Sequence, residues 1–521
     1  MSATPPDTAY SRDWKEAVLS FFHPRVVTMF FFGFSAGLPL LLIFSSLSLW
    51  LREAGVQRSD VTFFSWAALG YSFKFVWAPL VDRLPLFYLS EKFGRRRGWI
   101  LLSQFLIIAA ILWIGLTDPN QGKIHVYLMA LAAVLLGFSS ATQDIVIDAY
   151  RIESAGSELQ AMMASAYIAG YRIGMLAAGA GALFIADVLG SGMGHYDYNA
   201  WRYTYFIMAS FMMIGVLTTL SVPEPESATD NKSYQYASKD YLCSFSLFIL
   251  AASVFVACFF LTADTAAFYK GSLEGLFSNP YLAGFLIELA RFIVALSSAL
   301  LTAYLLGMTG IVNREMIDDT YIAPVKDFFQ RYGALLAVLL LFLVGLYRIS
   351  DIVLGVISNL FYQDLGFTKS EIASIVKTYG LFMTIAGGFI GGIFSARYGV
   401  IRILFAGALL ACATNLLFMI LAKAGHNVFM LYVVISADNL AAGLSCAAFV
   451  AFLSSLTSIR FTAVQYAIFS SLMMLIPKIF GGYSGTIVDN LSYEAFFLIT
   501  ALLGLPVLVL VRLAGKYIEI G

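Results

Sequence analysis

Charged residues are scarce in this sequence. Asp, Glu, Lys and Arg make up 12% of its 521 residues, whereas 60% are hydrophobic. A typical soluble domain has about 25% charged and about 45–50% apolar residues. This composition excludes the two or three soluble domains that the length alone would suggest. Basic and acidic residues are balanced at 32 each, which gives no indication of a nucleic-acid or polyanionic partner.

Cysteine and histidine are also scarce, and this argues against catalytic and metal chemistry. The four cysteines, Cys243, Cys258, Cys412 and Cys446, lie in apolar stretches at spacings that fit no zinc or redox motif. We interpret them as small core residues. The four histidines are scattered singly, so we expect no metal, no cofactor and no enzyme activity. A sensor or scaffold would need an attached soluble domain, and no loop is long enough for one.

Long apolar runs are what the sequence has instead. A helix that crosses a bilayer needs about 20 mostly apolar residues, and runs of that length recur along nearly the whole chain. The first run lacks a signal-peptide cleavage site, so we expect it to remain in the mature protein. We predict fourteen spans, near residues 26–52, 61–80, 98–116, 124–150, 161–188, 201–222, 242–266, 278–306, 333–361, 370–396, 400–423, 427–457, 463–488 and 492–515.

Basic residues in the connecting segments predict the orientation, because Lys and Arg in short loops are retained on the cytoplasmic side. Nineteen of them fall on the side that also holds the chain termini, and seven on the other side. An even number of spans places both termini on one side. We therefore predict that both termini are cytoplasmic.

An internal repeat indicates two related halves. A shift of roughly 306 residues places Gly137-Phe138-Ser139 on Gly443-Leu444-Ser445, and Arg172 on Lys478. Six spans occupy only about 200 residues, so an inserted pair of helices must separate the halves. The predicted organisation is a cytoplasmic N-terminus (1–25), a six-helix bundle (26–222), a linker (223–332) with extra helices at 242–266 and 278–306, a second six-helix bundle (333–515) and a cytoplasmic C-terminus (516–521).

Charges inside the predicted spans are the main candidates for function. An ionisable group near the bilayer centre costs several kcal/mol, so each is expected to face a cavity or a partner. The excess of cations favours an anionic substrate such as a carboxylate, although structural ion pairs between helices remain the alternative. The candidates, with two polar neighbours, are Lys74, Gln143, Asp144, Asp148, Arg172, Arg348, Asp351, Lys377, Asp438, Asn439 and Lys478.

A short polar segment after the second span resembles the cytoplasmic signature of the major facilitator superfamily. It runs from Ala78 through Asp82 and Arg83, and continues with Gly94, Arg95, Arg96 and Arg97. In that family the Asp and Arg residues latch the two halves together. The alternative is that these arginines only set the orientation.

A more specific resemblance follows from motifs that occur in the order found in AmpG-type muropeptide permeases. They include Gly33-Phe34-Ser35-Ala36-Gly37, Tyr71-Ser72-Phe73-Lys74, Thr142-Gln143-Asp144-Ile145-Val146-Ile147-Asp148, Gly170-Tyr171-Arg172-Ile173-Gly174, Leu346-Tyr347-Arg348-Ile349-Ser350-Asp351, Lys377-Thr378-Tyr379-Gly380 and Asp438-Asn439-Leu440. The resemblance implies an all-α polytopic fold of the major facilitator type in the bacterial inner membrane, and a monomer surrounded by lipid. It adds Tyr71 and Tyr171 to the substrate-binding candidates.

The same resemblance implies a substrate and an energy source. These permeases import N-acetylglucosaminyl-anhydro-N-acetylmuramic acid and its peptides from periplasm to cytoplasm, with protons. We expect Gln143 to bind a sugar and Asp144 to carry the proton, because movement of Arg172 relative to Asp144 would change its proton affinity. Asp148 is the other candidate for the proton. The alternative substrate class is acetyl-CoA or another organic anion.

Overall fold

Helices account for the fold of the protein in this computed structural model. The structure describes residues 14–56, 71, 73–86, 88–192, 195–225, 236–266, 268–269, 280–309, 312–481 and 484–518. In these ranges 13 helices are long and apolar enough to cross a membrane, and each overlaps one of the predicted spans. The predicted span near 61–80 lies mostly outside the described residues. The total of fourteen, and the side on which the termini lie, therefore stay predictions.

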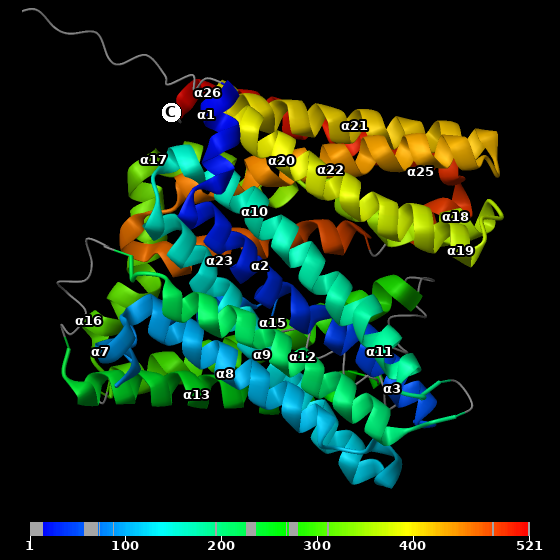
Figure 1. The fold of residues 1–521 in the computed structure, drawn as a ribbon. Coiled ribbons are helices and arrows are strands. Elements are labelled where there is room, and N and C mark those ends of the chain that lie inside the picture. The colour runs from blue at the N-terminus through cyan, green and yellow to red at the C-terminus, as the bar shows by residue number, and fades with distance from the viewer. Residues whose placement is uncertain are drawn as a thin grey trace, which may run out of the picture. The chain divides into compact units, whose positions relative to one another are not determined.

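The contacts divide the chain into two units, Met1–Asp230 with Phe328–Gly521, and Asn231–Asp327. The first unit contains helices from both predicted bundles, which Figure 1 shows in blue to green and in yellow-green to red. Its N-terminal helices are α1 (Trp14–Leu19), α2 (Pro24–Leu41), α3 (Leu47–Glu53), α6 (Ala78–Arg83), α7 (Leu89–Phe93), α8 (Arg95–Gly115), α9 (Lys123–Ser154), α10 (Ser157–Leu176), α11 (Ala182–Val188) and α12 (Tyr198–Ser221).

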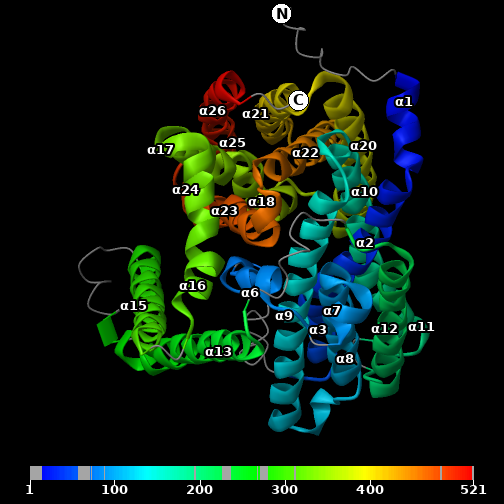
Figure 2. The ribbon, with the colours of Figure 1, turned by 90° about the vertical axis from the view of Figure 1, so that its left-hand side faces the viewer.

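The C-terminal helices complete the first unit. They are α17 (Ala323–Leu346), which starts just before the unit boundary, α18 (Ile349–Asp364), α19 (Lys369–Glu371), α20 (Gly380–Tyr398), α21 (Val400–Ala424), α22 (Val428–Leu456), α23 (Thr462–Gly481), α24 (Ser484–Asn490), α25 (Tyr493–Leu503) and α26 (Leu505–Tyr517). Contacts between the two halves of this unit run from α10 to α20 and α22, and from α6 and α9 to α23. Figure 2 shows α6 beside α23.

Two motif glycines explain the close packing of α2 on α10. A Cβ atom added at Gly33 would overlap the carbonyl oxygen of Tyr167, and one added at Gly170 would overlap that of Phe30. Small residues let helix backbones approach closely in a membrane, where packing rather than hydrophobic burial drives association. The motifs that carry the family resemblance therefore include the residues that bring α10, with its tyrosines, against α2.

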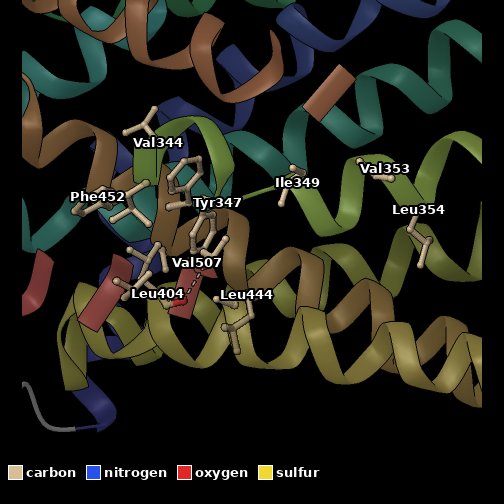
Figure 3. Packing of buried hydrophobic residues seen from close by; sticks show 14 of the residues in the cluster. Val344, Tyr347, Ile349, Val353, Leu354, Leu404, Leu444, Phe452 and Val507 are labelled. Carbon is tan, nitrogen blue, oxygen red and sulfur yellow. Dashed lines mark hydrogen bonds between the residues drawn. The ribbon is translucent and has the colours of Figure 1, made fainter. Parts of the chain in front are cut away.

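The core of the second half is built around a break between α17 and α18. We predicted one continuous span near 333–361, but Arg348 has φ −100° and ψ 14°, so the helix ends at Leu346 and restarts at Ile349. Tyr347 is held in this break, because its hydroxyl donates to the Leu404 carbonyl at 2.9 Å. Its ring stacks on Phe449 at 4.3 Å between centroids. Figure 3 shows Tyr347 among the buried residues of this core.

Two glycines that the sequence repeat places in nearly equivalent positions have the same local role. Gly94 precedes α8 with φ 88°, and Gly399 precedes α21 with φ 87°. Only glycine adopts this left-handed region without strain. Each glycine therefore permits a sharp turn into the next helix, which is the turn required between adjacent antiparallel spans.

The second unit contains α13 (Ser238–Leu261), α15 (Pro280–Met308) and α16 (Arg314–Ile317). Here α13 packs on α15. The guanidinium of Arg291 on α15 lies 4.2 Å from the centroid of the Phe259 ring and donates to the Phe259 carbonyl at 2.6 Å. The ring face and the carbonyl of Phe259 thus both attract this cation, and the contact joins α13 to α15.

Candidate functional site

The carboxylate of Asp82 joins the two halves of the first unit. It lies in the last turn of α6 and is 3% exposed. Oδ1 accepts hydrogen bonds from Nη2 of Arg96 at 2.7 Å and from the Ala463 amide at 3.2 Å, and Oδ2 accepts from the Val464 amide at 3.0 Å. Both amides belong to the first turn of α23, where backbone donors are free and the helix dipole favours a negative charge. A side chain of the first half thus caps a helix of the second.

Two of the predicted gating arginines, Arg95 and Arg96, contact Asp82. Arg96 is 1% exposed, and its Nε donates to Glu153 at the end of α9 at 3.0 Å. Arg95 donates to the Asp82 carbonyl at 2.9 Å. Arg97 donates instead to a backbone carbonyl near the end of α12 at 3.0 Å. The buried charge of Arg96 is therefore shared between two carboxylates, and this arrangement satisfies a cation that would be costly alone.

Two further contacts complete this end of the unit. Glu224 accepts hydrogen bonds from the amides of Arg96 and Arg97, in the first turn of α8, at 2.6 and 3.0 Å. A Cβ atom added at Gly94 would overlap the Glu224 side chain, which would then have to move away from the start of α8. The guanidinium of Arg83 lies 5.5 Å from the centre of the Phe461 ring, a second contact between the halves. We name the end of the unit with Asp82, Arg83 and Phe461 the latch face.

A cluster of opposite charges lies in the first half. Oδ2 of Asp148 is 4.0 Å from Nζ of Lys74, and Oδ1 accepts from Nη2 of Arg151 at 3.3 Å. Oδ1 of Asp144 accepts from the Tyr167 hydroxyl at 3.2 Å. Lys74 also interacts electrostatically with Asp144. We name Lys74, Asp144, Asp148 and Arg151 the charge cluster, which contains two carboxylates and two cations.

Tyrosines of both halves lie near the charge cluster. The hydroxyls of Tyr71 and Tyr171 interact electrostatically with Asp144. Tyr466 on α23 interacts with Asp148 and Asp144. The cluster therefore belongs to the first half but faces a tyrosine of the second, which places it where relative movement of the halves would change its surroundings.

Arg172 has different neighbours from those we expected. Its electrostatic partners are Cys446, Arg348 and Tyr171, whereas the cation that acts on Asp144 is Lys74. Tyr167 and Tyr171 are one turn apart on α10 and lie on the same face of the helix. Arg172 is the next residue and therefore points away from the face that Tyr167 presents to Asp144. Arg172 of the first half and Arg348 of the second thus form a pair of like charges. Among the described residues, Nε of Arg348 is buried without a hydrogen-bond acceptor.

The acidic candidates of the second half lie near one another. Asp351 interacts electrostatically with Arg348, and Asp438 interacts with Asp351. Oδ1 of Asp438 also accepts a hydrogen bond from the Thr414 hydroxyl at 3.3 Å. This group has one cation for two carboxylates, so its charge balance differs from that of the charge cluster.

Four predicted residues lie apart from these groups. Gln143 is fully buried and donates to the Ser35 hydroxyl on α2 at 2.9 Å, so it turns away from Asp144. Asn439 accepts from the hydroxyl of Thr384 at 2.8 Å and donates to a carbonyl of its own helix at 3.0 Å. Lys377 and Lys478 are exposed. The roles assigned to all four stay predictions.

Sequence reasoning missed several residues that the structure places in these networks. Arg151 directly follows the predicted span near 124–150 and is one of the nineteen basic residues from which we predicted the orientation, but it is 1% exposed and bonded to Asp148. Its position one helical turn after Asp148 was a usable signal, since residues three apart share a helix face. Glu153 and Glu224 each follow an apolar span, where a charged residue only indicates that the span has ended. Their contacts depend on how α9 and α12 meet α8.

The chain belongs to the major facilitator superfamily. The family model described as Major Facilitator Superfamily matches residues 26–317 and 335–517. The chain is accordingly a membrane transporter and a multi-pass protein of the bacterial inner membrane.

The chain is also similar to named members of one branch of that family. It is 29% identical over 496 residues to the "Putative transporter AmpG 4" of Rickettsia felis, which covers 95% of this chain and 98% of that protein. It is 27% identical over 500 residues to the "Anhydromuropeptide permease" of Escherichia coli K12, which covers 96% of this chain and 81% of that protein. The resemblance inferred from the motifs is confirmed.

Solved structures with low sequence identity share the fold. The proton:xylose symporter XylE superposes with a TM-score of 0.56 at 12% identity, over 96% of this chain and 95% of that chain. FucP in the outward conformation gives a TM-score of 0.57 at 13% identity, over 95% of this chain and 99% of that chain. The predicted fold class is confirmed.

Proposed function

We propose that this transporter imports peptidoglycan fragments, N-acetylglucosaminyl-anhydro-N-acetylmuramic acid and its peptides, from periplasm to cytoplasm. Transport proceeds in symport with protons, by alternating access between the two halves. The proposed substrate rests on the similarity to the anhydromuropeptide permease along 96% of this chain. The observation in the structure that carries the mechanism is the balanced charge cluster beside the second half.

The charge count of that cluster favours proton symport of an anion. With Lys74 and Arg151 charged and both Asp144 and Asp148 deprotonated, the four side chains sum to zero. One added proton leaves a single positive charge in a poorly solvated place, which is unfavourable until an anion arrives. A substrate carboxylate would restore neutrality. Proton and anion therefore favour each other's binding, which is the thermodynamic requirement for symport.

A carboxylate would also find two guanidinium groups between the halves. Arg172 and Arg348 repel each other electrostatically, and Nε of Arg348 lacks an acceptor among the described residues. Two like charges are stabilised by an anion placed between them, and arginine binds carboxylates through paired hydrogen bonds. Because one arginine comes from each half, an anion bound to both would draw the halves together on that side.

The direction of transport is supported by the latch face. Asp82 and Arg83 hold the halves together at the end of the unit that carries Arg95, Arg96 and Arg97. The density of basic residues predicts that this end is cytoplasmic. On that orientation the two halves are held together at the cytoplasmic end, which alternating access requires while an importer takes up substrate from the periplasm.

Uptake by proteoliposomes with the protein in known orientation tests this proposal. Labelled disaccharide-anhydromuropeptide should accumulate when the outside is acidified, and a protonophore should abolish accumulation while leaving exchange of labelled for unlabelled substrate. Equal uptake with and without the proton gradient would contradict symport. Labelled acetyl-CoA is the matched probe for another organic anion, and its accumulation in place of the muropeptide would replace the proposed substrate.

A further inference from the structure

The last helix, α26, has a buried face and an outer face. It packs on α21 and α25, as Figure 2 shows for α21. The residues that it buries most completely are at most 1% exposed, and they are Val507, Val511 and Ala514. On the opposite side, four exposed residues follow the spacing i, i+3, i+4 and i+7, which places them on one face of the helix. They are Val509, Arg512, Leu513 and Lys516.

A hollow of about 470 Å³ lies against the outer face of α26. Its lining residues are Val509, Arg512, Leu513, Gly515 and Lys516. The Val509 side chain is 59% exposed and that of Leu513 is 37% exposed, so apolar groups and two cations border the same space. A ligand that matches this hollow therefore carries both an anionic group and an apolar chain.

A third cation comes from the neighbouring helix α21. Gly515 lets α26 approach α21 closely, since a Cβ atom added there would lie 2.7 Å from Cγ2 of Ile401. Arg402 follows Ile401 in the first turns of α21, and its side chain is exposed. We name Arg402, Arg512 and Lys516 the basic corner of the second half.

Among the described residues, the basic corner forms no ion pair with a carboxylate. Residues 372–437 and 495–518 contain no Asp or Glu, and the next carboxylate along the chain, Glu519, lies outside the described residues. Arg512 and Lys516 are four residues apart on one helix face, where like charges repel each other. An anion between them would relieve this repulsion, and a phosphate group accepts several charged hydrogen bonds at once.

The basic corner lies at the depth of lipid headgroups. The apolar span Tyr493–Tyr517 ends directly after Lys516. Tyr517 is 62% exposed, and Nζ of Lys516 lies 5.7 Å from the centre of its ring. A similar pair ends α20, where the Arg397 guanidinium lies 5.6 Å from the centre of the Tyr398 ring. Tyrosines at span ends mark the membrane interface. Basic residues that only set orientation need no common face with apolar residues around a hollow.

We propose that the basic corner binds the headgroup of an anionic phospholipid. Arg512 and Lys516 bind the lipid phosphate, Arg402 adds to the attraction, and one acyl chain covers Val509 and Leu513. Basic pockets at the ends of membrane helices recognise headgroups of this kind. A free phosphate ion would satisfy the cations but would leave the two apolar side chains uncovered, so the geometry favours a lipid. The bound lipid stabilises the fold, because it binds the folded state alone.

Lipid binding to the purified full-length protein tests this site. Native mass spectrometry in detergent should show adducts of phosphatidylglycerol at lower lipid concentration than adducts of phosphatidylcholine with the same acyl chains. Arg512→Gln combined with Lys516→Gln should weaken the binding of phosphatidylglycerol about tenfold or more, because each basic residue at the membrane surface adds to the attraction of an anionic lipid. Phosphatidylglycerol should also raise the thermal unfolding midpoint of the wild type, and this rise should be lost in the double variant.

A second double variant is the matched control. Lys123→Gln combined with Lys423→Gln removes the same charge from two exposed residues at other span ends, and it should keep the wild-type affinity for phosphatidylglycerol. Unchanged affinity in the variant of Arg512 and Lys516 would overturn the proposal, and so would an equal loss in both double variants. Equal affinity of the wild type for phosphatidylglycerol and phosphatidylcholine would overturn it as well.

Two measurements on the wild type complete the test. Inorganic phosphate should not displace phosphatidylglycerol, and displacement would overturn the proposal by making a free anion the ligand. Should the variant of Arg512 and Lys516 fail to fold, phosphatidylglycerol with a photoreactive acyl chain decides. It should label residues 505–517, and labelling confined to other helices would overturn the proposal.

Discussion

The amide of Val464 donates to Oδ2 of Asp82 at 3.0 Å, across 382 residues of sequence, and so binds the first half to the second. The capped helix, α23, begins at Thr462. Because Asp82 also receives Arg96, the bond depends on a carboxylate that is itself held in place. The signature motif therefore acts through a helix N-terminus of the opposite half rather than through a pair of opposite side chains.

Asp82→Asn should weaken closure of the latch face without unfolding the protein. Arg96 keeps Glu153 as a counter-ion, so the main loss is the charged cap, which contributes about 1–2 kcal/mol. The closed population should therefore fall about tenfold, measured by the rate at which a cysteine at position 464, which is buried beside Asp82, is labelled. Asp118→Asn is the control, because Asp118 binds Tyr196 and Asn120 within the first half. Equal labelling of the Asp82→Asn variant and wild type would contradict this role.

Gly170→Ala should destabilise the first half through the contact between α2 and α10. The added Cβ would overlap the Phe30 carbonyl oxygen, and extra atoms in a well-packed contact typically cost about 1–3 kcal/mol. Thermal unfolding in detergent should shift downward. Gly355→Ala in α18 is the matched control, since its Cβ would meet nothing within 4 Å, and alanine favours helix. An unchanged midpoint for Gly170→Ala would show that the helices separate at little cost.

Composition and motif order were sufficient to predict the 13 spans that the described residues contain, because a membrane helix is defined by its length and polarity. They also placed Asp82 and its arginines at one end, since a helix boundary follows from polar residues. The partner of Arg172 was not predictable. Asp144 and Arg172 lie on different helices, and which cation meets Asp144 depends on the rotation of α10 that the glycine contacts impose. Lys74 lies in a short turn before α6, and this position likewise depends on tertiary packing.

The connection before α20 should show a local dependence on pH. The Thr368 amide and hydroxyl both donate to Oε2 of Glu371 at 2.8 Å. The backbone hydrogen bond first, then that of the hydroxyl, lowers the pKa of Glu371 below its ordinary value. A carboxylate with a depressed folded-state pKa stabilises fully above its unfolded pKa of about 4.3, and this stabilisation is lost as pH falls through the lower folded value.

Hydrogen exchange of the amides at 369–375 checks that dependence. Protection should fall more steeply below about pH 4 in wild type than in Glu371→Gln, because Gln can also act in a capping box but does not titrate. The control segment is the start of α22, where Asn427 caps the Met430 amide at 2.9 Å without an ionisable group. The same slope in wild type and Glu371→Gln would exclude the carboxylate as the cause.

Arg172→Gln and Arg348→Gln should each weaken uptake of substrates that carry peptide more than uptake of the disaccharide alone, because the peptide adds carboxylates. Loss of a hydrogen bond to a charged group costs about 1.5–3 kcal/mol, so the ratio of the two uptake rates should change about tenfold or more. Lys478→Gln, at an exposed position equivalent to Arg172 in the repeat, is the comparison. An equal decrease for both substrates would assign the arginines a structural role.

Asp144→Asn should abolish accumulation driven by a proton gradient while leaving exchange of substrate measurable. In the structure Asp144 has a single hydrogen-bond donor among the described side chains, Tyr167, and shares Lys74 with Asp148. Asp148 has two cations close to it, so removing its charge leaves both without their nearest counter-ion. An asparagine at this position keeps an acceptor for Tyr167 and cannot bind a proton, so it separates an effect on coupling from an effect on folding.

Accumulation retained in Asp144→Asn but lost in Asp148→Asn, at equal protein levels and with exchange intact in both, would move the proton to Asp148. Loss of exchange in Asp144→Asn would instead make Asp144 a substrate ligand.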